Sequence, residues 1–150
     1  NSVLISNGLA AMGFALPAAI AAKLVHPERK VVAVSGDGGF LMNLQELETA
    51  KRLNLAIVNV IFRDGGYNLI QWKQQARLGR ESGVEFTNPD FVTLAQAFGA
   101  KGFRVDSARD LAPVLTEALA WPGPSIVDVP VDYRENPKLT ERLGQLVCPI

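Results

Sequence analysis

The chain has 150 residues, 48% hydrophobic and 20% charged, which is ordinary for a soluble globular domain with its own core. Its 15 basic and 15 acidic residues cancel to a formal net charge of zero, so the composition gives no reason to expect nucleic acid or an anionic membrane as partner. A single cysteine, Cys148, cannot form an internal disulfide, which fits a cytoplasmic location. We therefore expect one cytoplasmic domain whose function lies in a local site.

The first predicted element is a helix after the glycine-rich turn at residues 8–13. Pro17 fits its first turn, small apolar residues follow, and His26 with Pro27 ends it. The segment lacks a basic leader and is too short to cross a bilayer, so a buried helix is expected and a signal peptide is not. Because the chain begins with Asn1 and leads at once into this motif, we expect it to be a piece of a longer polypeptide.

Two apolar runs, residues 31–35 and 55–62, predict neighbouring parallel strands. Asp37 follows the first run within a Gly-Asp-Gly-Gly tetrad, and Asp64 closes the second. Because parallel strands present their carboxyl ends at one edge of a sheet, both carboxylates are expected at the same crevice. Either Asp alone would be typical of a turn or a helix cap. Together, with flanking glycines, they favour a divalent cation that holds a phosphate-bearing cofactor.

Two helices are expected around this pair of strands. Asn43 with Glu46 resembles a capping box, so a helix is predicted from Asn43 onward, with first N–H groups that favour negative charge. A polar helix is predicted after Asp64 and includes Trp72. Residues 79–89, rich in charge and turn formers, then form a loop that is a candidate mobile segment.

The second half of the chain continues the alternation of helix and strand. Asp90 is predicted to cap a helix that stops at Gly99, and a strand follows at residues 102–105. Ser107 with Asp110 is expected to start the next helix by the same capping pattern. These signals place helices between strands throughout.

The order of elements predicts the fold class. A last strand is expected at residues 125–131, which would complete a domain at residues 1–131 and leave residues 132–150 as a carboxyl-terminal tail. Strands that alternate with helices indicate an α/β fold with a doubly wound, mainly parallel sheet and helices on both faces.

Other classes of phosphate site fit the glycine motif less well. The G-x-G-x-x-G spacing of a dinucleotide site is absent, and so is the Gly-Lys-Ser/Thr ending of a Walker loop. A receiver domain, which is a binding and signalling module, also gathers Asp residues at strand ends around magnesium. It would need an early acidic pair and a Lys after its last strand, whereas this strand ends Val129-Pro130-Val131.

Residues 36–40, followed by residues 46–50 and 64–68, resemble the thiamine diphosphate motif of the 2-oxo-acid carboligases and decarboxylases. Residues 8–20 are similar to the segment upstream of that motif in the same family. Ser82 to Phe86 and Val129 to Pro137 resemble the acetolactate synthases, particularly the catabolic form that condenses pyruvate. The resemblance covers essentially the whole chain as the family's carboxyl-terminal, diphosphate-binding domain, with the thiamine diphosphate-binding fold.

The resemblance implies a set of site residues. Asp37 and Asp64 would be side-chain ligands of Mg²⁺, with the carbonyl of Gly66 as a third ligand. Backbone N–H groups near Gly38 and Gly39 would hold the diphosphate. The cofactor-binding residues implied in this way are Gly8, Met12, Gly36, Gly38, Gly39 and Asn68.

Two further roles follow from the same resemblance. Met12 matches the bulky residue that supports the bent cofactor, although by itself it would be read as a core residue. Trp72 matches the residue that shapes the pocket for the second oxo acid in the biosynthetic enzymes, and by itself packing is equally expected. Gly65 stands where the catabolic subgroup carries Asn.

The resemblance implies an enzyme that joins two molecules of pyruvate with loss of CO₂, using thiamine diphosphate and Mg²⁺. Its active site would be shared between the subunits of a homodimer or homotetramer, and the isolated fragment would be inactive because the activating Glu belongs to an absent amino-terminal domain. Binding of FAD is left open. Pyruvate oxidase and glyoxylate carboligase are alternatives within the family, and a non-catalytic receiver-like domain is the alternative outside it.

Overall fold

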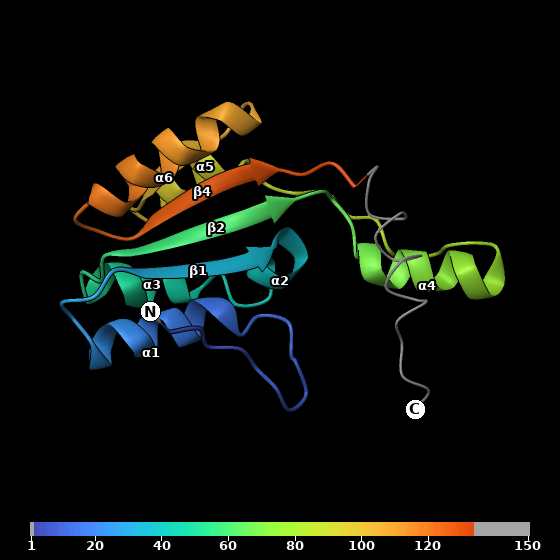
Figure 1. The fold of residues 1–150 in the computed structure, drawn as a ribbon, viewed down its shortest axis with the longest axis horizontal. Helices are drawn as coiled ribbons and strands as arrows, with labels where there is room; N and C mark the ends of the chain where they lie inside the picture. Colours follow the sequence, from blue (N-terminus) through green and yellow to red (C-terminus); the bar gives the residue numbers. More distant parts are fainter. Residues whose placement is uncertain (1, 134–150) are drawn as a thin grey trace.

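The computed structural model describes residues 2–133 and contains a four-stranded, all-parallel sheet (Figure 1). The strands lie in the spatial order β1-β2-β4-β3, so the chain crosses over between strands instead of forming hairpins. Their bounds are β1 (Val31–Gly36), β2 (Ile57–Arg63), β3 (Lys101–Arg104) and β4 (Ser125–Pro130). The predicted α/β fold is confirmed. No helix among the described residues is both long enough and apolar enough to cross a membrane.

Three helices cover one face of the sheet. They are α1 (Ala15–Val25), α3 (Glu46–Arg52) and α5 (Phe91–Ala97), and with the sheet they enclose the larger hydrophobic core. Leu47, Ile57 and Phe91 are completely buried in this core. Burial of such large apolar side chains on both sides of the interface is the main force that holds these helices on the sheet.

Within the described part of the chain, a single α-helix covers the other face. The short 3₁₀ turn η1 (Ala108–Asp110) leads into α6 (Leu111–Ala120), which packs Ala118 against Val58 and Val127 of the central strands (Figure 1). Helices therefore lie on both faces, as predicted. Because α6 lies over β2, β3 and β4, side chains of the edge strand β1 on this face stay exposed.

The glycine tetrad forms a helix earlier than expected. The short helix α2 (Asp37–Leu41) begins at Asp37 itself, and the helix predicted from Asn43 onward is present as α3 but begins later, at Glu46. The Asn43 side chain donates to the carbonyl of Gly13 at 3.0 Å and caps no helix; α3 begins at Glu46 without a side-chain cap. Gly13 has a φ of +88° and no Cβ, which leaves room for the Asn43 amide beside it.

Of the two other predicted helix caps, one is present in the structure and one is not. Asp90 accepts a hydrogen bond from the Thr93 N–H at 2.8 Å, so its predicted cap is confirmed. The predicted capping pattern of Ser107 with Asp110 is wrong, because the Ser107 hydroxyl donates to the Asp110 carboxylate at 2.5 Å instead of holding a backbone N–H. That contact joins the two side chains and leads into a 3₁₀ turn before α6.

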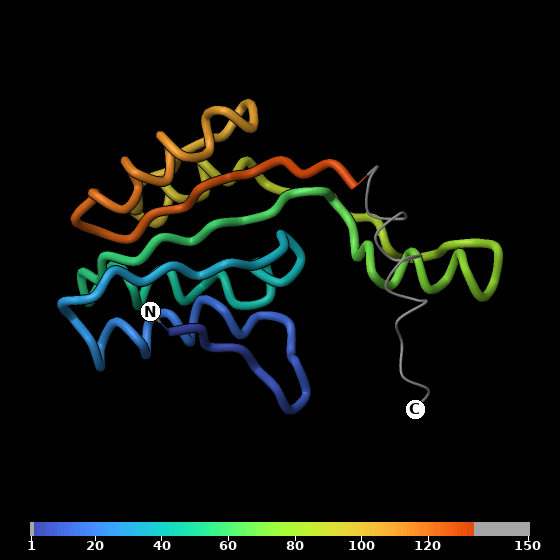
Figure 2. The backbone as a smooth tube through the Cα atoms, viewed as in Figure 1, coloured from blue at the N-terminus to red at the C-terminus, as the bar shows by residue number. Residues whose placement is uncertain are grey.

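The helix α4 (Asn68–Leu78) extends away from the sheet beyond the carboxyl ends of the strands (Figure 2). It contains no buried residue, which agrees with its polar sequence. Residues 79–89, the loop that follows α4, are a candidate mobile segment from the sequence. The second half of this loop is hydrogen-bonded to the turn that follows β2. Tyr67 N donates to the Val84 carbonyl at 2.8 Å, and Phe86 N donates to the Gly65 carbonyl at 3.1 Å.

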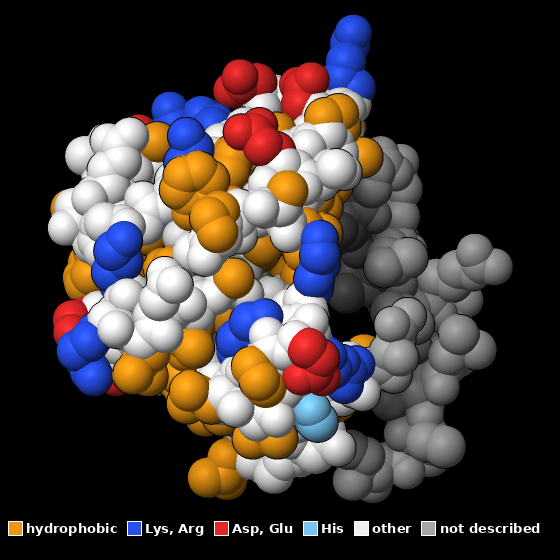
Figure 3. Space-filling view, turned by 90° about the vertical axis from the view of Figure 1, so that its left-hand side faces the viewer, with side chains coloured by type: hydrophobic (Ala, Val, Ile, Leu, Met, Phe, Trp, Pro, Cys, Tyr) orange, Lys and Arg blue, Asp and Glu red, His pale blue; other side chains and the backbone are white. Residues whose placement is uncertain are grey.

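The amino ends of the strands lie at the opposite end of the molecule. There, basic and acidic side chains are interspersed among hydrophobic ones on the part of the surface that the described residues form (Figure 3). This mixture agrees with the balanced charge of the chain. Most of the predicted carboxyl-terminal tail, residues 134–150 with Cys148, lies outside the described residues.

Candidate metal and cofactor site

The two predicted metal ligands, Asp37 and Asp64, lie together at the carboxyl ends of β1 and β2. The two strands pair in parallel up to Gly36 and Phe62, so the residues that follow them leave the sheet side by side. The Asp64 N–H donates to Asp37 Oδ2 at 3.0 Å, and the Gly65 N–H donates to the same oxygen at 2.8 Å. The predicted convergence of the two residues is therefore present.

Asp37 is a buried carboxylate held by neutral donors. Only 2% of its surface is exposed, and the Gly38 N–H donates to its Oδ1 at 2.8 Å. Among residues 2–133, no Lys, Arg or His lies within ion-pair distance of Asp37. A buried charge without a cationic partner is expensive in free energy, which favours a cation as its missing partner.

Asp64 is half-buried, and one of its oxygens, Oδ1, accepts the Gly66 N–H at 2.9 Å. The Tyr133 hydroxyl is hydrogen-bonded to the same carboxylate. Burial, and after it this hydrogen bond, raises the pKa of Tyr133 to about 12, so the phenol stays protonated as a donor. The Tyr133 ring also packs edge-on against Trp72, with ring centroids 5.7 Å apart.

An open cleft of about 1360 Å³ runs from the amino-terminal segment along β1 to both Asp residues. Six further predicted site residues line it: Met12, Gly36, Gly38, Gly39, Gly66 and Asn68. Gly8 and Trp72 do not line it; Gly8 is exposed, with nothing within 4 Å of the position of a Cβ. Met12 is 46% exposed, so among the described residues it is not the core residue that the pattern alone suggested.

Glycine at position 38 permits a close approach of two aromatic rings. A Cβ at Gly38 would lie 2.7 Å from Tyr67 Cε1 and 3.2 Å from Phe86 Cζ. The two rings pack against each other with centroids 4.9 Å apart. The Gly38 N–H, which was expected to hold the diphosphate, already donates to Asp37 in this structure.

The donor set fits a small hard cation that shares its coordination with a phosphate. No group of three or more His, Cys, Asp or Glu side chains placed to hold a metal occurs in the described part of the chain. Two carboxylates therefore have to be supplemented by backbone carbonyls, such as that of Gly66, and by oxygens of a ligand. Mg²⁺ is commonly bound through one or two carboxylates together with substrate phosphates.

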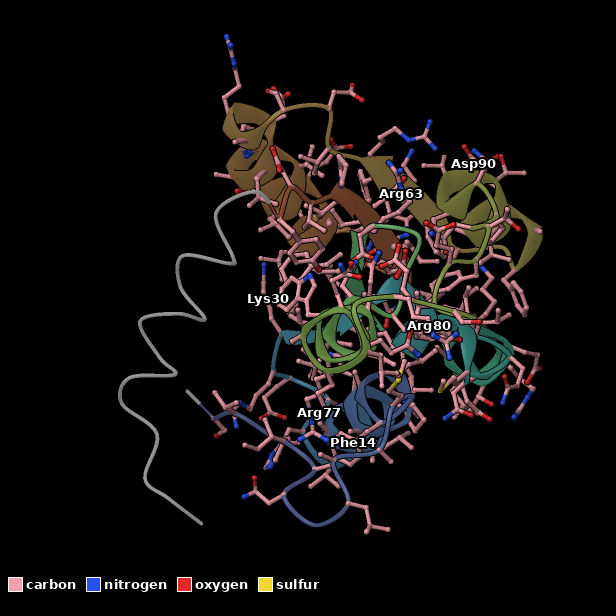
Figure 4. All side chains as sticks on the ribbon, turned by 90° about the vertical axis from the view of Figure 1, so that its right-hand side faces the viewer. Phe14, Lys30, Arg63, Arg77, Arg80 and Asp90 are labelled. Atoms are coloured by element: carbon pink, nitrogen blue, oxygen red, sulfur yellow. The ribbon has the colours of Figure 1, made fainter. Side chains whose placement is uncertain are left out.

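Sequence reasoning missed two residues that contact this pair. Asn88 donates from Nδ2 to Asp37 Oδ2 at 2.6 Å across 51 positions of chain, and Tyr133 contacts Asp64. Asn88 stands just before Pro89 and the cap residue Asp90, so its sequence context indicates only a helix lead-in. Figure 4 looks onto this end of the molecule, where the labelled Arg63 and Asp90 mark the neighbouring cluster of charges.

The family model described as the C-terminal TPP binding domain of thiamine pyrophosphate enzymes matches residues 1–129. The chain belongs to this family. The match spans the sheet, both Asp residues and the glycine tetrad, and it agrees with the resemblance inferred from the motifs. A receiver-like domain is accordingly not favoured.

Three relatives are similar to the chain over most of its length. The chain is 54% identical over 146 residues to the catabolic acetolactate synthase of Raoultella terrigena and 46% identical over 151 residues to the acetolactate synthase of Bacillus subtilis, with 97% of the chain covered in each case. It is also 42% identical, over 84% of its length, to a putative thiamine pyrophosphate-containing protein of Bacillus subtilis. The chain spans about a quarter of the length of these relatives, 26%, 26% and 22% respectively.

Proposed function

We propose that the chain is the cofactor-binding part of a Mg²⁺-dependent acetolactate synthase, which condenses two pyruvates to 2-acetolactate and releases CO₂. The identity to acetolactate synthases over nearly the whole chain supports this reaction over those of pyruvate oxidase and glyoxylate carboligase. When bound, thiamine diphosphate supplies the electron sink on which a 2-oxo acid loses CO₂. We further propose that the protein is cytoplasmic and that its active site is shared in a homodimer or homotetramer.

The roles of the chain's own residues follow from their chemistry. Asp37 and Asp64 would ligate Mg²⁺ with the carbonyl of Gly66, and the cation would neutralise the diphosphate beside the two carboxylates. Met12, exposed at the cleft, would support the bound cofactor. The assignments of Gly8, Gly36, Gly38, Gly39 and Asn68 to the cofactor, and of Trp72 to the pocket for the acceptor, stay predictions.

One observation carries the proposal. The backbone of the second candidate ligand donates to the side chain of the first, Asp64 N to Asp37 Oδ2 at 3.0 Å, and the Asp64 carboxylate itself accepts the Gly66 N–H at 2.9 Å. Backbone donors of one turn therefore orient both carboxylates. Preorganised ligands lose little conformational entropy on binding, which favours affinity. Charge supports it as well, since Asp37 is buried among neutral donors.

The proposal is tested by calorimetric titration of thiamine diphosphate into the cofactor-stripped, full-length protein, with and without Mg²⁺, followed by a product assay on pyruvate. Binding that requires Mg²⁺, together with 2-acetolactate as product, is the expected result. Binding without 2-acetolactate would keep the cofactor site and reject the reaction. Uptake of added flavin with oxidation of pyruvate would favour the oxidase. No binding at all would reject the site itself.

A further inference from the structure

From the described residues, Asp37 receives four hydrogen bonds, and they are unequally shared between its two oxygens. Oδ2 accepts three, from Asp64 N at 3.0 Å, Gly65 N at 2.8 Å and Asn88 Nδ2 at 2.6 Å. Oδ1 accepts one, from Gly38 N at 2.8 Å. An ionised carboxylate offers about four lone-pair sites, two on each oxygen. Oδ2 is therefore filled, and only Oδ1 keeps a lone pair for a cation.

Asn88 is the one side chain among these four donors. The three others are backbone N–H groups of the two strand-end turns, whereas Asn88 reaches Asp37 from the far end of the loop after α4. Its orientation is fixed, because the flipped amide would set Oδ1 of Asn88 against a carboxylate oxygen. In that orientation Oδ1 of Asn88 is buried and has no hydrogen-bond partner among residues 2–133.

The backbone on both sides of Asn88 is anchored. On one side, Gly66 and Glu85 form an antiparallel bridge and Phe86 N donates to Gly65 O at 3.1 Å. On the other side, Asp90 caps α5, whose Phe91 is completely buried. Because the backbone is held on both sides of Asn88, its amide has a fixed position against Asp37 and supports the orientation of the carboxylate.

We propose that Asn88 is a positioning residue that selects Oδ1 of Asp37 as the oxygen that ligates the cation. The inference rests on the proposed Mg²⁺ site. The Asn88 amide adds a third donor, the only one from a side chain, to an oxygen that two backbone N–H groups already occupy. It thereby holds the carboxylate against rotation and keeps the cation from binding through both oxygens. Partners of this kind, which orient a metal ligand without touching the metal, typically contribute about 10–100-fold in metal affinity.

The test uses the full-length protein and measures the Mg²⁺ concentration that gives half-maximal binding of thiamine diphosphate. Asn88→Ala removes the donor, and the matched control is Thr87→Ala, at the exposed neighbouring position on the same loop. We expect Asn88→Ala to raise that Mg²⁺ concentration at least about 10-fold and the control to leave it unchanged. At saturating Mg²⁺ the KM for pyruvate should equal that of the unmodified protein, because the proposed role gives Asn88 no contact with the substrate.

The outcomes separate this inference from the proposed function. If the unmodified protein binds thiamine diphosphate without regard to Mg²⁺, the proposed site fails and the role of Asn88 fails with it. If binding requires Mg²⁺ but Asn88→Ala has an unchanged Mg²⁺ requirement, only the positioning role is overturned. A merely structural role would lower the melting temperature without moving the Mg²⁺ midpoint, which also counts against it. Should Asn88→Ala not fold, Asn88→Ser serves the same measurement with a smaller change of volume.

Discussion

Asp37, directly after β1, and Asp128, inside β4, are almost equally buried, yet they are held in opposite ways. Asp37 is 2% exposed and is surrounded by neutral donors, three backbone N–H groups and one amide. Asp128 of β4 is 1% exposed and is held by two guanidinium groups. Arg63 Nε donates to its Oδ1 at 2.7 Å, and Arg104 Nε lies 3.4 Å from its Oδ2.

The comparison teaches that the charge of the partners, and not burial, separates the proposed metal ligand Asp37 from the structural carboxylate Asp128. The neutral donors around Asp37 fix its geometry without cancelling its charge, so the proposed cation would gain a full negative partner there. At Asp128 the charge is already matched by arginines from β2 and the end of β3, and the three residues join three neighbouring strands. A buried pair of this kind specifies geometry more than it adds stability.

The largest expected effect is that of removing the Asp37 carboxylate. In Asp37→Ala the full-length protein should lose Mg²⁺-dependent binding of thiamine diphosphate, with the apparent Mg²⁺ affinity lowered more than about 100-fold, because even indirect partners of a ligand contribute about 10–100-fold. Asp64→Ala should behave in the same way. Calorimetric titration of the cofactor at increasing Mg²⁺ measures both. Retention of metal-dependent binding in either variant would remove that residue from the ligand set.

Asp128→Ala tests the other half of the comparison. Removal of this carboxylate leaves Arg63 and Arg104 without their buried partner, and breaking a buried pair typically costs about 3–5 kcal/mol in free energy of unfolding. Because both arginines reach solvent, we expect about 3 kcal/mol, the lower end of that range. Urea unfolding measures it, with Asp106→Ala at an exposed position as control. The folded variant should keep the Mg²⁺ dependence of the unmodified protein; a shifted dependence would show that the two aspartates are coupled.

A third change probes the packing that supports the Asp37 turn. Gly38→Ala would place a Cβ 2.7 Å from Tyr67 Cε1 and 3.2 Å from Phe86 Cζ, and overpacking of this kind costs about 1–3 kcal/mol. Gly36→Ala is the matched control, because its Cβ would have only the Phe62 carbonyl near it, at 4.0 Å. Chemical unfolding of the two variants side by side should give a lower stability for Gly38→Ala alone. Equal stabilities would mean that the two rings move aside freely.

The position of Asp37 and its proximity to Asp64 could be predicted from the sequence. Glycines and apolar runs are local signals, and they correctly indicated the two strands and the convergence of Asp37 with Asp64. The parallel sheet followed from the alternation of helix and strand for the same reason. Each of these inferences needs only neighbouring residues and the rule that parallel strands end at one edge.

The partners that distinguish the two aspartates could not be predicted. Asn88 reaches Asp37 across 51 positions and Arg63 reaches Asp128 across 65, and no local pattern marks either contact. The predicted cap at Asn43 was wrong for the same reason, since a tertiary partner, the Gly13 carbonyl 30 positions away, took the side chain. Sequence patterns therefore locate the charges, and long-range contacts decide which of them are neutralised.

The smallest expected effect is at Asp90, the exposed carboxylate that pairs with Arg104. Arg104, the partner of Asp128, also donates through Nη2 to the exposed carboxylate of Asp90. The backbone N–H of Thr93, and after it this bond to Arg104, lowers the pKa of Asp90 from 3.8 to about 2, while the bond raises the pKa of Arg104. Asp90 is thus an exposed counterpart of the buried Asp128, with a cap in addition.

Because the folded state holds Asp90 at the lower pKa, its ionised form stabilises the fold above the unfolded pKa of 3.8, and that contribution disappears as the pH falls from about 4 to about 2. We expect Asp90→Ala to lower the urea midpoint slightly and by a constant amount between about pH 7 and about pH 5, and the difference from the unmodified protein to shrink below about pH 4. Asp106→Ala, which removes an exposed carboxylate without a cap, should show no such convergence. A difference that stays constant down to about pH 3 would mean that Asp90 acts through its shape and not through its charge, and the cap and the Arg104 bond would then carry no electrostatic weight.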